Sequence, residues 1–410
     1  METKMKLYPE LSLNLRSLVI FRNLLSDPVV ARLLALCEAE RGNITALVTR
    51  YAGFARALYA STAPAPGEDA AVSGNLGAYL LRVLSEDENF YLLRRAGGCA
   101  PDPELEALLD RELDFFDQVA LFSSEKVRAA LGWNGALPDW KSGDAHIRET
   151  YRRRMGEIGT RGYGIFAKHH IFVLRGNAVA PVRNPDPTAL SQLRGYEQER
   201  GEIVRNTEAL LNGKPAANIL LYGDAGTGKS STVKAVANEY KARGLRLIEL
   251  KKDQLGMIPW LLDQLGNNPL KFILFIDDLS FNCDDDNFSA LKAVLEGSVA
   301  AKAPNLVVYA TSNRRHLVKE SFSDRAGDEI HFSDTMEELN SLSARFGLTV
   351  TFAKPNRDGY LDILMDLARQ YGVTTPEDSL KRGAEVYAIE RGGRSPRVAK
   401  QYIELVKSRE

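Results

Sequence analysis

The feature that most constrains the fold is a glycine-rich segment at residues 223–230. It reads Gly-Asp-Ala-Gly-Thr-Gly-Lys-Ser, follows the apolar run 219–222 and precedes a helical pattern. This is the pattern G-x-x-x-x-G-K-[ST], in which glycines let backbone N–H groups turn toward phosphate oxygens and the next helix adds its positive end. The segment predicts a strand, a phosphate-binding loop and a helix, and this context makes a chance match the weaker interpretation.

Each loop position has an expected part in binding a nucleotide. We expect Lys229 to reach the β- and γ-phosphates, and Ser230 to offer its hydroxyl to Mg²⁺, a hard ion that takes few protein ligands. The residues expected to bind the phosphates are Gly223, Asp224, Ala225, Gly226, Thr227, Gly228, Lys229, Ser230 and Ser231.

Two acidic residues, Asp277 and Asp278, follow another apolar run at residues 272–276. Open α/β sheets bind ligands at the carboxyl ends of their strands. We therefore expect Asp277 to complete the Mg²⁺ site and Asp278 to face the attacking water as a general base. The alternative is that two acids after a strand are merely a solvated turn. Their combination with the phosphate loop favours the metal site.

Apolar runs alternate with helical patterns in the C-terminal half. Candidate strands are residues 219–222, 245–250, 272–276, 306–311 and 349–352. Strands joined by helical crossovers form a parallel sheet, so we expect an α/β fold with a five-stranded parallel phosphate-loop sheet. Three further helical patterns, at residues 360–371, 380–390 and 398–407, suit a helical lid.

The N-terminal part differs in pattern. Apolar residues recur at helical spacing from residue 11 to about 131, which predicts a mainly helical domain. Residues 164–182 become strand-like around Gly176-Asn177, which predicts a β-hairpin, and three prolines at 181–187 mark a connector. The expected domains are 1–162 (helical), 163–189 (hairpin and connector), 190–355 (nucleotide-binding core) and 356–410 (lid).

Composition excludes several other classes. The 410 residues carry 53 Lys and Arg against 54 Asp and Glu, so a polybasic arm or an acidic tail is not expected. The three cysteines have no CxxC spacing, which argues against a disulfide framework or a zinc ribbon. No apolar run approaches the roughly 18 residues that a membrane span needs, and no signal peptide is evident, so we expect a cytoplasmic protein without a membrane partner.

In their order, the motifs from about residue 190 onward resemble an AAA+ ATPase module. Residues 193–197 resemble the segment that lies against adenine, which implies that Gly195 and Tyr196 line the base. Residues 306–313 resemble the sensor-1 strand, whose last residue, Asn313, would hold the attacking water or the γ-phosphate. A strand-end Asn outside such a context is often only a turn former.

Two arginine-bearing segments extend the resemblance. Residues 342–348 resemble the segment that supplies an arginine finger to a neighbouring subunit, which implies that Arg345 acts in trans. Residues 392–397 resemble the sensor-2 motif of the lid. Arg397 is preferred there because Pro396 places it in the first helical turn, and Arg394 is the alternative. More narrowly, residues 222–231 and 275–281 resemble a bacterial family of uncharacterised AAA+ ATP-binding proteins.

The resemblance implies a Mg²⁺-dependent ATPase that forms homo-oligomers and acts on an unidentified protein or nucleic-acid partner. ATP rather than GTP is chosen from the resemblance alone. The usual acid pair of the superfamily is Asp-Glu, and Asp278 is one methylene shorter than that glutamate. A general base must come within about 2.6–3.2 Å of its water. The alternative is therefore a slowly hydrolysing nucleotide-dependent switch, adaptor or loader. A small-molecule kinase shares the loop but does not explain Asn313, Arg345 and Arg397 in this order.

Overall fold

The structure is a computed structural model that describes residues 6–63, 73–133, 135–279, 291, 295, 303–313 and 345–410. The chain divides into two compact units, residues 1–168 and 169–410, and each is considered by itself. Residues 280–281 and 342–344, which carry parts of the motifs above, lie outside the described residues. Of the helices in the described ranges, none is long and apolar enough to cross a membrane.

The N-terminal unit is helical, as its periodicity predicts. Side-chain caps fix where several helices begin: the Asp27 carboxylate accepts hydrogen bonds from the N–H groups of Val29 and Val30, and Pro28 occupies the first helical position. The elements are α1 (Pro9–Arg16), the 3₁₀ turn η1 (Arg22–Ser26), α2 (Pro28–Cys37), α3 (Ile44–Ser61), α4 (Leu76–Glu86), α5 (Phe90–Ala96), α6 (Pro103–Ala120), α7 (Ser124–Leu131), α8 (Ile147–Gly156), α9 (Ile158–Arg161) and α10 (Ile165–Lys168).

A buried carboxylate organises the core of this unit. Glu112 on α6 is 6% exposed and accepts hydrogen bonds from the backbone N–H groups of Val19, Ile20 and Phe21 at 2.7, 3.2 and 3.0 Å. These three groups stand between α1 and η1, where the backbone makes no helical ladder. One side chain thereby satisfies three donors at the edge of the apolar core, as buried polar groups require.

We expect Glu112→Ala to lower the free energy of unfolding of the N-terminal unit by about 2–4 kcal/mol, because each buried donor left without an acceptor costs about 1–3 kcal/mol. Differential scanning calorimetry of the full chain measures this change. Glu104→Ala, an exposed change on the same helix, should shift stability by less than about 1 kcal/mol. Equal losses in the two variants would contradict the role given to Glu112.

The C-terminal unit contains a seven-stranded sheet in the order β2-β1-β4-β5-β6-β3-β7. All neighbouring strands are parallel except β2, which pairs antiparallel with β1. Its strands are β1 (Ile171–Arg175), β2 (Ala178–Pro181), β3 (Ile219–Gly223), β4 (Leu245–Leu250), β5 (Lys271–Ile276), β6 (Leu306–Ser312) and β7 (Leu348–Phe352). The α/β fold and the five expected parallel strands are confirmed. The predicted hairpin is present too, but it joins the sheet through β1 instead of standing apart.

One local expectation is wrong. Residues 165–168 were expected to be strand-like, and they form the short helix α10. Gly162 and Gly164 both have positive φ, at 71° and 55°, which turns the chain, and the N–H of Phe166 then bonds to the carbonyl of Tyr163. The remaining domain divisions, at 162/163, 189/190 and 355/356, stay predictions.

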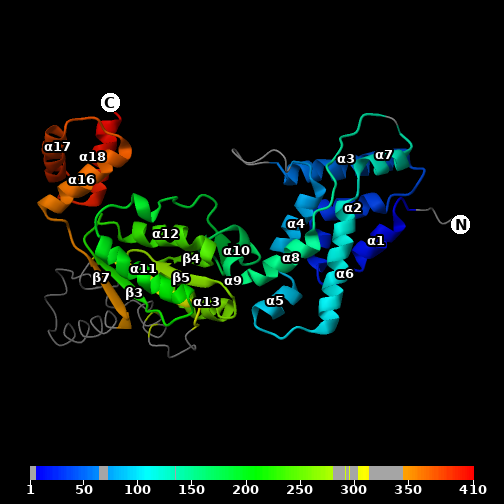
Figure 1. The fold of residues 1–410 in the computed structure, drawn as a ribbon, viewed down its shortest axis with the longest axis horizontal. Coiled ribbons are helices and arrows are strands. Elements are labelled where there is room, and N and C mark those ends of the chain that lie inside the picture. The colour runs from blue at the N-terminus through cyan, green and yellow to red at the C-terminus, as the bar shows by residue number, and fades with distance from the viewer. Residues whose placement is uncertain are drawn as a thin grey trace. The chain divides into compact units, whose positions relative to one another are not determined.

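Helices surround the sheet and follow it. They are η3 (Leu190–Gln192), α11 (Glu197–Leu211), α12 (Lys229–Tyr240), η4 (Lys241–Arg243), η5 (Lys252–Met257), α13 (Ile258–Leu265), α16 (Arg357–Tyr371), α17 (Glu377–Glu390) and α18 (Pro396–Lys407). The last three pack on one another around Tyr360, Leu364 and Ile403 (Figure 1). They form the helical C-terminal lid that the sequence predicts.

The strand register sets where ligand groups gather. Tyr222 pairs with Ser312, and Ile276 pairs with Ala310. The carboxyl ends of β3, β5 and β6 therefore lie at the same edge, with β5 ending two residues before β6. The residues that follow these strands, Asp277, Asn313 and the phosphate loop, share one edge of the sheet.

Candidate functional site

The phosphate loop runs from the end of β3 to the start of α12, and two glycines show why it has this shape. Gly223 has φ 133°, and a Cβ there would lie 2.2 Å from the carbonyl oxygen of Phe352. Gly228 has φ 95° at the start of α12, and a Cβ there would meet no described atom within 4 Å. The first glycine allows close packing on β7, and the second leaves open space before the helix N-terminus, where an anion is favoured.

Lys229 lies under the loop and is 5% exposed. Its Nζ donates to the carbonyl oxygens of Gly223 and Asp224, at 2.8 and 2.7 Å, and to Oδ1 of Asn313 at 2.9 Å. Burial lowers the pKa of Lys229, while the nearby carboxylates, Asp224 first, act in the opposite direction. The ammonium is thus held at the loop by oxygen acceptors of the kind that a phosphate supplies.

Ser230 and Asp277, the two residues expected to bind a metal ion, lie in direct contact. Ser230 Oγ donates to Asp277 Oδ1 at 2.5 Å, and Thr311 Oγ1 donates to the same oxygen at 2.6 Å. A hydroxyl beside a carboxylate, next to a phosphate loop, is a donor set that suits Mg²⁺, which keeps several waters and takes its other ligands from phosphate. These residues therefore fit the ion that the sequence implies.

Asp278 and Asn313 form a second pair. Asn313 Nδ2 donates to Asp278 Oδ1 at 2.7 Å, and the N–H of Asp278 donates to Thr311 Oγ1 at 2.9 Å. Asp278 has φ 54°, the left-handed region that Asp tolerates better than most residues. A strained backbone that two neighbours hold in place is a feature found at functional sites.

These groups surround a cavity of about 260 Å³. It is lined by Ala225, Gly226, Gly228, Lys229, Ser230, Ser231, Asp277, Asp278, Thr311, Asn313 and Arg397. The structure thus brings together the loop, both acids, the strand-end Asn and one lid arginine.

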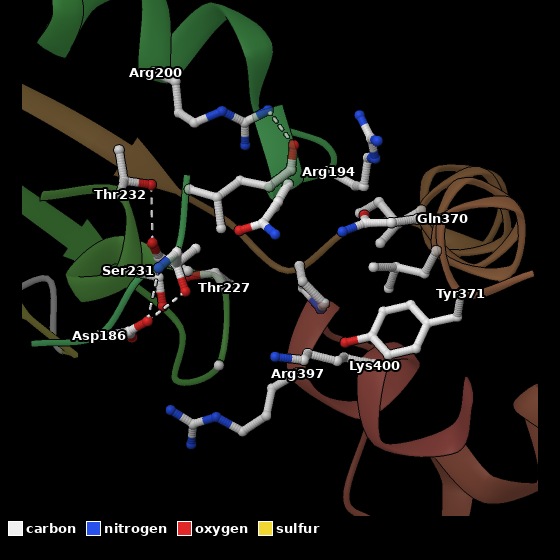
Figure 2. A pocket seen from close by; sticks show the side chains of 18 of the residues that line it. Asp186, Arg194, Arg200, Thr227, Ser231, Thr232, Gln370, Tyr371, Arg397 and Lys400 are labelled. Atoms are coloured by element: carbon white, nitrogen blue, oxygen red, sulfur yellow. Dashed lines mark hydrogen bonds between the residues drawn. The ribbon is translucent and has the colours of Figure 1, made fainter. Parts of the chain in front are cut away.

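A larger cavity of about 570 Å³ adjoins the other side of the loop. Its described lining is Asp186, Pro187, Thr188, Gln192, Leu193, Arg194, Arg200, Gly226, Thr227, Gly228, Ser231, Thr232, Ile363, Leu367, Gln370, Tyr371, Pro396, Arg397 and Lys400. Figure 2 shows Tyr371 and Lys400 extending from the lid toward the loop. Leu193, Ile363 and Leu367 give this lining an apolar part, and most of its other side chains are polar or charged. A volume of about 300–1,000 Å³ is typical of small-molecule sites.

Gly195 and Tyr196 are absent from the described lining of this cavity, which includes the preceding residues Leu193 and Arg194. A Cβ on Gly195 would lie 2.7 Å from Cδ1 of Ile363, so this glycine allows the lid to pack closely. Tyr196 donates its hydroxyl to the carbonyl of Ala353 at 2.6 Å, and burial raises its pKa to about 12. Gly195 thus lies against Ile363, a residue of the lining, and Tyr196 is held to the segment that follows β7.

The two lid arginines lie in different places. Arg397 lines both cavities, and its N–H donates to the carbonyl of Gly226 at 3.1 Å. Arg394 bonds to Glu385, with Nη2 at 2.6 Å from a carboxylate oxygen, and lines neither of the two cavities among the described residues. The structure therefore favours Arg397 as the arginine that faces a ligand.

Arg345 stands three residues before β7. Gly223, where the phosphate loop begins, pairs with Phe352 at the far end of that strand. Five residues of strand span about 16 Å. Arg345 therefore lies near the amino ends of the strands, whereas the loop of its own chain lies at their carboxyl ends. It lines neither described cavity.

Sequence reasoning missed Thr311 and the lid side chains of the larger cavity. A hydroxyl residue just before Ser312 and Asn313, at the end of the apolar strand β6, was the available signal for Thr311. Ile363, Leu367 and Lys400 carried no signal, because their place in the cavity depends on how the lid packs on the core.

A parallel sheet with this loop, an acidic strand end, a polar strand end and an arginine-bearing helical lid defines an AAA+ module. Residues 167–410 match the family described as "Protein of unknown function (DUF815)". That match covers more than half of the chain, and the protein belongs to this family.

Similarity to curated proteins is local. The chain is 33% identical over 103 residues to the 26S proteasome regulatory subunit 4 homolog of Encephalitozoon cuniculi, covering 22% of this chain and 24% of that protein. It is 35% identical over 65 residues to the replication factor C large subunit of Sulfolobus acidocaldarius, covering 16% and 14%. The chain thus spans about a quarter or less of the length of these relatives.

Solved structures are similar at low identity. The Thermotoga maritima RuvB Holliday junction branch migration motor has a TM-score of 0.37 at 16% identity, covering 53% of this chain and 63% of that chain. AMPPCP-bound DnaA from Aquifex aeolicus has a TM-score of 0.38 at 19% identity, covering 55% and 66%.

Proposed function

We propose that the protein binds ATP with Mg²⁺ and hydrolyses it. The observation that carries this proposal is the smaller cavity, where Lys229, Asn313 and Asp278 form one hydrogen-bonded chain beside the pair Ser230 and Asp277. The adjoining cavity offers apolar side chains, Leu193, Ile363 and Leu367, that would suit a nucleobase, and it shares the loop with the smaller cavity. The nucleobase would thus lie against apolar side chains in the larger cavity, and the triphosphate would lie beside the polar and charged groups of the smaller one.

In this proposal the loop N–H groups and Lys229 bind the phosphates, and the ammonium exchanges its carbonyl partners for phosphate oxygens. Ser230 and Asp277 would hold Mg²⁺, which neutralises charge on the phosphates. Thr311 orients Asp277, since its hydroxyl bonds to the carboxylate oxygen that Ser230 also contacts. Arg397, which reaches both cavities from the lid, adds positive charge at the phosphates.

Asp278 is the proposed general base for the attacking water. The hydrogen bond from Asn313 fixes one of its oxygens, which leaves the other to accept a proton from water. Asn313 in turn connects the base to Lys229. The side chain of Asn313 therefore holds the general base and the phosphate-binding lysine in fixed positions relative to each other.

We further propose that catalysis takes place between subunits. Arg345 is too far from the loop of its own chain to reach a phosphate there, so it would act on a neighbour. A guanidinium supplied in trans stabilises the transition-state charge. The proposed assembly is a homo-oligomer, with the helical N-terminal unit available to an unidentified protein or nucleic-acid partner.

A second candidate is a nucleotide-dependent switch, adaptor or loader with slow turnover. The short side chain of Asp278 favours it, because this carboxylate reaches one methylene less far toward a water than the usual glutamate. Single-turnover measurements separate the two functions. An ATPase cleaves bound ATP faster than it releases it, whereas a switch releases ATP largely intact.

Thr311→Val tests the metal-binding arrangement. We expect it to raise the Mg²⁺ concentration needed for half-maximal turnover and to lower kcat about tenfold, because Asp277 loses a hydrogen bond and the N–H of Asp278 loses its acceptor. Thr311→Ser keeps the hydroxyl and should stay within about threefold of the wild-type rate. Equal rates in the Val and Ser variants would remove Thr311 from the site.

A further inference from the structure

We propose that Asp224 is a positioning residue that ties the phosphate loop to the hinge of the lid, so that occupancy of the loop sets the order of the hinge. The hinge is the segment 353–356, between the end of β7 and the start of α16. The inference rests on the proposed function for the identity of the ligand. Its structural part concerns the protein without nucleotide and can be tested there.

The contacts of Asp224 with this region come from both its side chain and its backbone. The N–H of Lys354 donates to Asp224 Oδ2 at 3.0 Å, and the N–H of Asp224 donates to the carbonyl of Phe352 at 3.2 Å. The hydroxyl of Tyr196 bonds to the carbonyl of Ala353, the residue between them. The first residues of the hinge are therefore held to the core by the loop and by Tyr196.

The same residue contacts the phosphate-binding lysine. Lys229 Nζ donates to the carbonyl oxygen of Asp224 at 2.7 Å. Asp224 thus meets Lys229 through its backbone and the hinge through its carboxylate. A phosphate that orders the loop and its lysine also orders Asp224, and with it the hydrogen bond to Lys354.

The loop holds the lid at a second point, two residues further on. The carbonyl of Gly226 accepts the N–H of Arg397 at 3.1 Å, and a Cβ on Gly226 would lie 3.1 Å from Ser395 Oγ. The lid is therefore attached to the loop near its hinge and at the start of α18. Two attachments fix an orientation that one cannot, so losing the bond at Asp224 should loosen the placement of Arg397.

Amide hydrogen exchange, followed by mass spectrometry on the full chain, tests the proposal. Peptides across 352–357 report Lys354, because Pro355 has no amide hydrogen and few other amides contribute. We expect Asp224→Ala to speed exchange in these peptides about tenfold, the loss of one hydrogen bond to a charged acceptor. Asp224→Asn keeps an acceptor oxygen and should remain within about threefold of wild type.

Lys354→Ala is the matched control. It removes the side chain but keeps the N–H that bonds to Asp224, so the hinge should exchange as in wild type. Peptides from β4 and β5 should be unchanged in every variant. Unchanged hinge exchange in Asp224→Ala would overturn the proposal. So would exchange that rises equally in Asp224→Asn, or that rises equally in β4 and β5.

The second part of the experiment adds ADP and Mg²⁺. In wild type we expect hinge exchange to slow about threefold, and in Asp224→Ala we expect no such slowing, because the connection is missing. ADP that binds wild type without changing hinge exchange would overturn the coupling. Absence of ADP binding would instead overturn the proposed function, while the result without nucleotide would still decide whether Asp224 holds the hinge.

Discussion

Replacing Lys229 with alanine is expected to raise the dissociation constant for ATP by about 100-fold or more. Lys229 is 5% exposed, and its ammonium lies at the loop among oxygen acceptors, where it can exchange a carbonyl for a phosphate. Removing it deletes charge-assisted hydrogen bonds and leaves those carbonyls without their donor. Isothermal titration calorimetry with ATP and Mg²⁺ measures the change.

Lys234→Ala provides the matched control for this variant. Lys234 is on the same helix, α12, its Nζ lies 3.2 Å from a carboxylate oxygen of Glu249, and it lines neither described cavity. The control should bind ATP with a dissociation constant within about twofold of wild type. Tight ATP binding by Lys229→Ala would show that the nucleotide site is not at this loop.

The second large effect is expected from Arg345→Ala. We expect kcat to fall about 10³-fold, as when an arginine finger is removed, while the dissociation constant for ATP stays unchanged. The reason is its position at the edge of the sheet opposite the loop, which separates it from the phosphates of its own chain. Arg243→Ala, which removes a half-exposed arginine on η4 that contacts Asn212, should leave both quantities near wild type.

Mixing variants separates action in trans from damage to the fold. The subunit with Arg345→Ala keeps the general base Asp278 and the phosphate loop, and the subunit with Asp278→Asn keeps Arg345. An equal mixture that exchanges subunits freely should regain turnover at about a quarter of its interfaces, where one variant supplies the loop and the other the arginine. No recovery in a mixture whose subunits do exchange would contradict shared sites, and so would normal turnover by Arg345→Ala alone.

The sequence predicts the C-terminal sheet well because buried parallel strands are continuous apolar runs. Residues 245–250 are β4 without any shift, and the other four strands extend their predicted ranges by one residue each. The attachment of the hairpin was not predictable in the same way. Pairing of β1 with β4 joins segments about 75 residues apart and depends on register, which an apolar run does not specify.

The site, too, contains residues that could be predicted from the sequence and residues that could not. Ser230 and Asp277 could be paired from their motifs, because the carboxyl ends of the parallel strands in one sheet lie at the same edge. The structure places Ser230 Oγ 2.5 Å from Asp277 Oδ1. Gly195 and Tyr196 are expected to line the adenine base, whereas the described lining of the larger cavity includes Leu193 and Arg194 from this segment. Which residue of a short segment faces a cavity depends on its backbone, and the positive φ of both Gly195 and Tyr196 is not specified by the motif.

The N-terminal unit shows what periodicity can and cannot provide. Its helices follow from apolar spacing and from cap residues such as Asp27. The burial of Glu112 could not be read from the sequence, where it looks like one of several acids on α6. Its role arises only when α6 packs beside residues 19–21 and meets their three N–H groups.

The most direct measurement of the central claim is the rate of phosphate release from ATP at increasing protein concentration, with Mg²⁺ and with excess chelator. The site described here predicts release that requires Mg²⁺, and a rate per subunit that rises with protein concentration as Arg345 meets the loop of a neighbour. Tight ATP binding with phosphate release no faster than that of Asp278→Asn would contradict hydrolysis at this site and leave the nucleotide switch as the function.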